Sequence, residues 1–151
     1  MAAAVDAAFT LLEREGAASL LRGSTVLVKP NLLGPSQPSS AVTTHPEFVR
    51  AVIEVLKQFT PRLVVGDSPG FGSCAQAAEA SGIAGVCREM GVALGSFSEP
   101  VEMHHPGGRV CRRFVVAREV AEADVVMNLP KLKTHRLTGI SCAVKNMFGC
   151  V

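Results

Sequence analysis

Residues 124–130 read DVVMNLP, a short apolar run that ends at a polar break and decides the fold that we expect. Two earlier runs have the same character, TVLVKP at 25–30 and RLVVGD at 62–67. Each is β-branched and apolar on both faces, which is typical of strands in a parallel sheet covered on both sides. Because helical patterns separate the runs, we predict the α/β class, with a doubly wound, mostly parallel sheet and flanking helices.

The helices are predicted from apolar periodicity and from boundary residues. The second helix is expected to begin at TTHPE, where Thr44 and Glu47 have the spacing of a capping box and Pro46 suits the first turn. The turn-like HHPGG at 104–108 indicates two short strands on either side of it. The other helical segments are expected at about 3–15, at 74–80 with Gly82 as its stop, from there to Met90, near 118–122, and from about Ile140.

The composition restricts the class of protein. The 151 residues are 48% apolar, with no Trp, no Tyr and seven Phe, so we expect one domain with a mainly aliphatic core. The net charge is only +2 and the basic residues form no long run, so nucleic acid is not an expected partner. Neither a signal peptide nor an apolar run of about 18 residues occurs, so we expect no membrane contact and a cytoplasmic location.

The chain ends at residues 148–151, FGCV, soon after a helix-like segment begins and without a closing strand or a polar tail. We therefore expect residues 1–151 to be a single α/β domain that forms the N-terminal portion of a longer domain. On this interpretation the chain would be a ligand-binding module whose catalytic half lies in the remaining portion.

The five cysteines do not have the spacing of a metal or disulfide framework. Their number is odd, no CxxC occurs, and a cubane iron–sulfur cluster normally uses tightly spaced cysteines. We interpret them as small buried hydrophobic residues. They are Cys74, Cys87, Cys111, Cys142 and Cys150.

Polar residues follow each of the three predicted strands. In an open parallel sheet, ligands bind beyond the carboxyl ends of the strands, so these polar clusters should lie on one edge and form one site. Single residues leave alternatives open. Lys29 can extend to water instead of contacting an anion. Asp67 can cap a turn instead of acting as a metal ligand, a hydrogen-bond acceptor or a partner for a lysine. The clusters are Lys29 to Asn31, Gly66 to Gly70, and Asn128 to His135.

The segment 128–146 is the most specific part of this site. Lys131 and Lys133 flank one leucine, so in an extended segment they point to the same side, and Lys145 follows shortly after. A phosphate, a carboxylate or another anionic small molecule is the natural ligand, with a solvated basic loop as the alternative. His135 is the best candidate for proton transfer or metal ligation. His45 can be a helix-start residue or a second base.

Five segments of this sequence, taken together and in their order along the chain, resemble the domain of unknown function 362, a family of bacterial and archaeal proteins. Its members are often labelled iron–sulfur cluster-binding because some are fused to a ferredoxin-type module. The resemblance therefore implies a ferredoxin-type module as a partner and an iron–sulfur cluster in fused relatives, although this chain lacks that cysteine-rich module. The segments are KPNLL at 29–33, TTHPEFVRAVIEVLK at 43–57, VVGDSPG at 64–70, ADVVMNLPKLKTHRLTG at 123–139 and AVKNMFG at 143–149.

A second resemblance concerns mechanism. His135, Gly139, Ser141 and Lys145 have a spacing similar to a segment of lactate racemase-type proteins, which carry a nickel-based cofactor. That resemblance implies a proton-transfer role for His135 and cofactor attachment at Lys145. The sequence has CAV at 142–144 where those proteins have paired glycines.

Three functions follow as expectations: an enzyme acting on small acidic metabolites, an iron–sulfur-associated redox protein or scaffold, and a ligand-binding module. The metal, if any, and the cofactor are left open. The residues expected to be catalytic are His135, Asp67 and Lys145. The residues expected to bind a ligand or cofactor are Lys29, Asn31, Ser68, Gly70, Asn128, Lys131, Lys133, Thr134 and Asn146.

Overall fold

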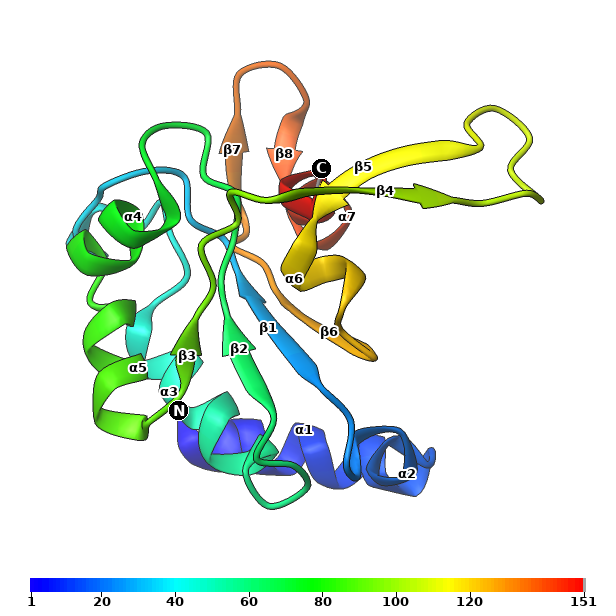
Figure 1. The fold of residues 1–151 in the computed structure, drawn as a ribbon. Coiled ribbons are helices and arrows are strands. Elements are labelled where there is room, and N and C mark those ends of the chain that lie inside the picture. The colour runs from blue at the N-terminus through cyan, green and yellow to red at the C-terminus, as the bar shows by residue number, and fades with distance from the viewer. Residues whose placement is uncertain (151) are drawn as a thin grey trace.

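A four-stranded parallel sheet forms the centre of the computed structural model, which describes residues 1–150 (Figure 1). The strand order is β3-β2-β1-β6, with β1 in the interior of the sheet and each pair parallel. The α/β prediction is confirmed, and all three predicted strands are present. The strands are β1 Val26–Pro30, β2 Leu63–Val65, β3 Ala93–Leu94 and β6 Val125–Leu129.

Helices flank the sheet, and its strand β1 is buried along its whole length. Val26 and Val28 of β1 are fully buried in a core that also contains the apolar side of α3. Helix α3 contacts both α1 and α5, and its stripe of Val49 and Ile53 faces the core, as the 3.6-residue period predicts. The helices are α1 Ala2–Arg14, α2 Ala17–Leu21, α3 Pro46–Leu56, α4 Cys74–Ala80, α5 Ile83–Met90, α6 Arg118–Ala121 and α7 Ala143–Asn146, with 3-10 turns η1 Pro38–Ser40 and η2 Met147–Cys150.

The predicted capping box at Thr44 is wrong. His45 is the N-cap of α3, and its Nδ1 accepts a hydrogen bond from the backbone N–H of Glu47 at 3.2 Å. The Thr44 hydroxyl instead donates to the carbonyl of Leu129 at 2.7 Å, so it joins the end of β6 to the start of α3. A capping box does occur at α4, between Ser73 and Gln76.

Two antiparallel hairpins leave the sheet at its carboxyl edge. The hairpin of β4 (Pro100–His104) and β5 (Arg113–Ala117) was predicted, and it projects from the body of the molecule (Figure 1). The hairpin of β7 (Lys133–His135) and β8 (Gly139–Ser141) replaces the predicted start of a helix at Ile140. Ile140 pairs with Thr134 across this hairpin, and α7 begins only at Ala143.

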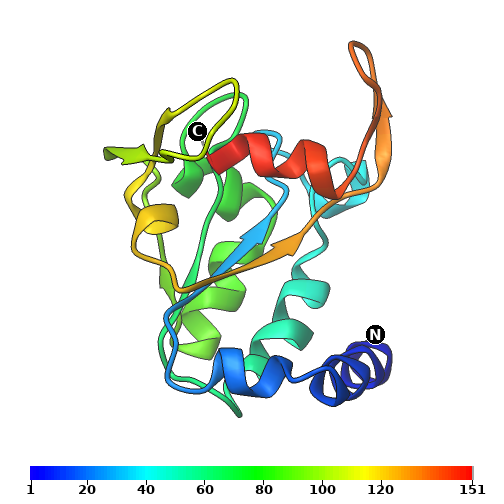
Figure 2. The same ribbon diagram turned by 90° about the vertical axis from the view of Figure 1, so that its right-hand side faces the viewer.

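The segment α7–η2 lies across the carboxyl ends of β1 and β6, between the two hairpins (Figure 2). It thus places residues 143–150 over the edge of the sheet where the polar strand-end clusters meet. Within residues 1–150, no helix combines the length and the apolar character that crossing a membrane would need.

Candidate functional site

A buried ion pair lies at the carboxyl edge of the sheet. Lys29, at the end of β1, is fully buried, and its ammonium contacts the Asp67 carboxylate and the carbonyl of Asn146, the latter at 2.6 Å. The other Asp67 oxygen accepts a hydrogen bond from the N–H of Leu32 at 2.8 Å. Because a buried charge is costly unless it is paired and hydrogen-bonded, this geometry requires both partners.

The pair decides between the alternatives for these two residues. Lys29 does not extend to water, and its charge is matched by Asp67, one of the roles considered for that aspartate. Burial raises the pKa of the Asp67 carboxyl, and the Lys29 charge and the Leu32 N–H act in the opposite direction. Asp67 is therefore a carboxylate held by its surroundings rather than an open ligand.

A chain of amide side chains extends from this pair to the neighbouring elements. Asn146 of α7 accepts from the side chain of Asn31 at 3.0 Å and donates to that of Asn128 at 2.8 Å. Asn128 in turn donates to the carbonyl of Ala143 at 3.0 Å. The network ties α7 to the ends of β1 and β6, and it orients the Asn31 side chain.

Lys133 joins the network from the β7–β8 hairpin. Its ammonium donates to Asn31 Oδ1 at 2.7 Å and to the carbonyl of Val42 at 2.5 Å. Burial lowers the pKa of Lys133, as do the charges of Lys131 and Lys145, whereas Asp67 raises it. The lysine is thus held at a fixed place by two acceptors, with Lys131 and Lys145 near enough to act on its pKa.

These residues border a crevice of about 410 Å³. That volume lies in the range of small-molecule sites. Two lysines, Lys133 and Lys145, and the imidazole of His135 line the crevice. Among the described lining residues the only carboxylate is Asp67, which Lys29 already neutralises. The other lining residues are Asn31, Leu32, Leu33, Ser68, Pro69, Gly70, Phe71, Ser141, Asn146, Phe148 and Gly149.

His135 lines the crevice, and one of its ring nitrogens is engaged in the turn of its own hairpin. Its Nδ1 accepts from the N–H groups of Leu137 and Thr138, each at 3.2 Å. A neutral imidazole that accepts at Nδ1 carries its proton on Nε2, so in this arrangement His135 offers a hydrogen-bond donor rather than an acceptor. Its side chain lies on the same side of β7 as Lys133, and Thr134 lies on the opposite, exposed side.

The structure does not place every predicted residue on the crevice wall. Asn31, Ser68, Gly70, Lys133 and Asn146 line it, together with Asp67, His135 and Lys145. Asn128 and Lys29 lie behind that wall, where they support Asn146 and Asp67. Lys131 and Thr134 are not among the lining residues, although Lys131 contributes charge to the surroundings of Lys133.

Sequence reasoning missed the contribution of Gly149. A Cβ added there would overlap the Asp67 carboxylate and lie 2.9 Å from the Lys29 ammonium. The backbone of η2 therefore approaches the ion pair as closely as only glycine permits. The missed aromatic residues Phe71 and Phe148 also line the crevice, and no periodic pattern in the sequence marks them.

The cysteines do not combine into a cluster site. Cys74, Cys87 and Cys150 are buried, whereas Cys111 and Cys142 are exposed, and burial raises the pKa of Cys87 to about 11. In residues 1–150, no group of three or more His, Cys, Asp or Glu side chains is arranged to hold a metal ion. The described residues therefore do not provide the thiolate set of an iron–sulfur cluster.

Fold and site together define an α/β protein with an open parallel sheet and a positively charged crevice at the carboxyl ends of its strands. Residues 26–151 match the family model of the domain of unknown function DUF362, and the chain belongs to that family.

A curated relative is the thylakoid-associated protein sll1697 of Synechocystis sp. (strain ATCC 27184 / PCC 6803 / Kazusa). It is 36% identical over 135 residues, which cover 85% of this chain and 40% of the relative. The chain thus spans less than half the length of this relative. No solved structure matches the chain significantly.

Proposed function

We propose that this chain binds an anionic small molecule in the crevice at the carboxyl ends of β1, β2 and β6. The observation that carries the proposal is that Lys133, Lys145 and His135 line one crevice. Among the described residues that line it, the only carboxylate is Asp67, which is already paired with Lys29. Phosphate and carboxylate groups are the ligands that such donors favour. The pairing of Asp67 with Lys29 supports the proposal because Lys133 and Lys145 then have no carboxylate of their own among the described lining residues.

In the proposed complex, Lys133 and Lys145 contact the anionic group and the Nε2–H of His135 donates to it. Asn31 and Asn146 act indirectly, since they hold Lys133 and α7 in place. If the bound molecule is also transformed, His135 is the residue that would give up a proton to it, and Asp67 stays a charge partner of Lys29.

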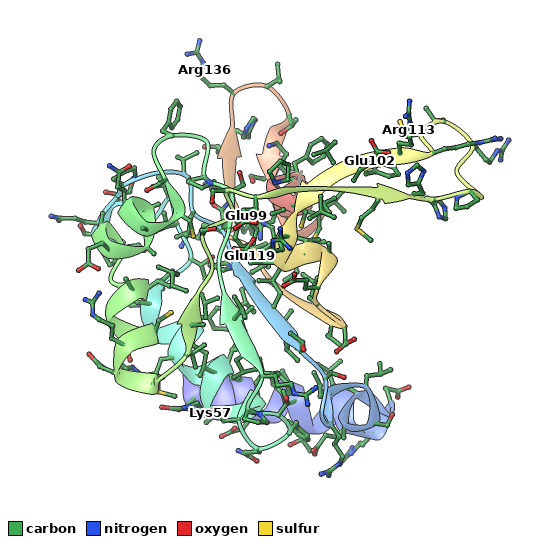
Figure 3. All side chains as sticks on the ribbon, in the orientation of Figure 1. Lys57, Glu99, Glu102, Arg113, Glu119 and Arg136 are labelled. Carbon is green, nitrogen blue, oxygen red and sulfur yellow. The ribbon has the colours of Figure 1, made fainter. Side chains whose placement is uncertain are left out.

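The test is to measure binding of methyl phosphate and acetate to the purified protein by NMR titration, with neutral acetamide as the control ligand. We expect Lys133→Met and Lys145→Met each to weaken binding by about tenfold or more, the usual effect of removing a charged hydrogen-bond donor. Arg136→Gln is the matched control, because Arg136 extends outward at the tip of the same hairpin (Figure 3). Equal affinities for all three variants would refute the proposal.

A second candidate function follows from His135 and Lys145 lining the same crevice. In a racemase-like enzyme, Lys145 would carry a covalently attached nickel-based cofactor that supplies the metal chemistry, and His135 would move the proton. The intact mass of the purified protein separates the two candidates. A mass equal to that of the sequence supports reversible anion binding, and an adduct localised to Lys145 supports the second function.

The cellular place of the proposed binding is a separate proposal. We place it in the cytoplasm, where small anionic metabolites are dissolved. The name of the Synechocystis relative describes that protein as thylakoid-associated. If this chain had the same location, its crevice would lie beside a membrane. Recovery of the native protein in the membrane fraction at physiological salt would overturn the cytoplasmic proposal.

A further inference from the structure

A second cavity of different character adjoins the crevice. This adjoining groove has a volume of about 510 Å³ and shares two walls with the crevice, Lys145 and Phe148. Its remaining walls are Thr138, Ile140, Cys142, Ala143 and Val144, which are almost entirely apolar. A cationic region and an apolar groove therefore meet at one pair of side chains.

Lys145 and Phe148 form the boundary between the two cavities. The Lys145 ammonium lies 5.3 Å from the centroid of the Phe148 ring, which is cation–π distance. Both residues line both cavities, so a cation and an aromatic ring stand together where the crevice and the groove adjoin. An acidic group bound by Lys145 would thus begin in the crevice, directly beside an apolar wall.

The groove exposes more apolar surface than isolated residues usually do. The side chains of Ile140, Val144 and Phe148 are 60%, 83% and 65% exposed, and they belong to one continuous wall. Apolar residues gathered along one groove are a feature of ligand-binding grooves, whereas apolar residues exposed singly need no explanation. Because the one charged residue among those lining the groove is Lys145, charge complementarity favours an occupant that carries a negative charge at that end.

We propose that the ligand is an amphipathic anion, with its acidic head in the cationic crevice and an apolar tail along Ile140, Val144 and Phe148. This inference rests on the proposed anion-binding function and adds the chemical class of the ligand. The shared chemistry is that of alkyl phosphates and alkyl carboxylates. The tail lies in the groove between the β7–β8 hairpin and α7.

The test uses a homologous series of methyl, butyl and hexyl phosphate, titrated by NMR into the purified protein. Affinity should rise by about twofold per added methylene, because a groove open on one side buries only part of each group. Val144→Ser and Ile140→Ser should flatten this rise and leave the affinity for methyl phosphate unchanged. Val110→Ser is the matched control, since Val110 is 95% exposed and lines neither cavity. Thermal melting checks that each variant folds.

The outcomes separate this inference from the proposed function. If methyl phosphate binds and chain length has no effect, the tail site is wrong and anion binding stands; a groove covered by another protein segment or by a second copy would give this result. If hexyl phosphate binds but Lys133→Met does not weaken it, the head is not in the crevice and both proposals fall. Both also fall if neither the phosphates nor acetate binds.

Discussion

At the scale of single residues, Lys29 shows how burial changes the role of a charged side chain. Its position at the end of an apolar strand left two interpretations, a lysine that extends to water and a lysine that contacts a ligand. The ammonium is fully buried and does not extend to water, because Asp67 and the carbonyl of Asn146 hold it. Lys29 therefore stabilises the edge of the sheet on which the crevice is built.

Loss of this lysine should be costly. We expect Lys29→Met to lower the free energy of unfolding by about 3–5 kcal/mol, since it leaves the buried Asp67 carboxylate without its partner. Adding Asp67→Asn removes the unpaired charge and keeps an acceptor for the Leu32 N–H, so the double variant should lose less. Urea denaturation at neutral pH measures both.

The control for this prediction is an exposed ion pair. Glu122→Gln, which breaks the exposed pair with Arg118, should leave the free energy of unfolding nearly unchanged. Because burial already raises the pKa of Asp67, the Lys29→Met protein can protonate that carboxyl, and its deficit should shrink as the pH falls. Equal losses in the single and double variants, at all pH values, would contradict the interpretation.

At the scale of elements, the segment α7–η2 connects the ion pair to the crevice. It carries Lys145, Asn146 and Phe148, and its backbone rests on Asp67 and Lys29 at Gly149. The N–H of Ser68 also donates to the carbonyl of Gly149, at 3.4 Å. The position of the crevice lysine therefore depends on a close backbone approach several residues away from it.

Gly149→Ala tests that dependence. The added methyl group must displace η2 from the ion pair, so we expect a loss of about 1–3 kcal/mol in stability, as in other overpacked sites. We also expect weaker methyl phosphate binding, because Lys145 moves with the segment. The control is Gly85→Ala in α5, where a Cβ meets only the Arg88 guanidinium at 4.0 Å and alanine favours the helix. Unchanged stability and binding in Gly149→Ala would show that η2 is not positioned by this contact.

At the scale of the whole molecule, the sequence predicted the sheet better than the site. The strands β1 and β6 have five residues each and begin as apolar runs that end at a polar break, a recognisable pattern, whereas β3 has two residues and β7 has three, too few for any period to show. The rule that ligands bind at strand carboxyl ends predicted which segments would meet. It could not predict pairing within them, because Lys29 and Asp67 are 38 residues apart and Asn31 and Asn146 are 115 apart.

The electrostatics of the crevice is likewise a property of the assembled chain. The pKa of Lys133 is lowered first by burial and then by Lys131 and Lys145, against the effect of Asp67 from another strand end. Only the protonated lysine attracts an anion. Affinity for methyl phosphate should therefore fall as the pH rises through this lowered pKa, at a lower pH than for an ordinary lysine.

The measurement is the dissociation constant of methyl phosphate from about pH 8 upward, where the ligand keeps one charge state. Lys133→Arg retains its charge throughout, so its decline in affinity should begin at higher pH. The free energy of unfolding of the ligand-free protein should instead rise with pH. With a folded-state pKa below that of the unfolded chain, the unfolded state binds more protons between the two values, and stability rises with pH there. A decline in affinity at the same pH in both proteins would show that Lys133 does not control it.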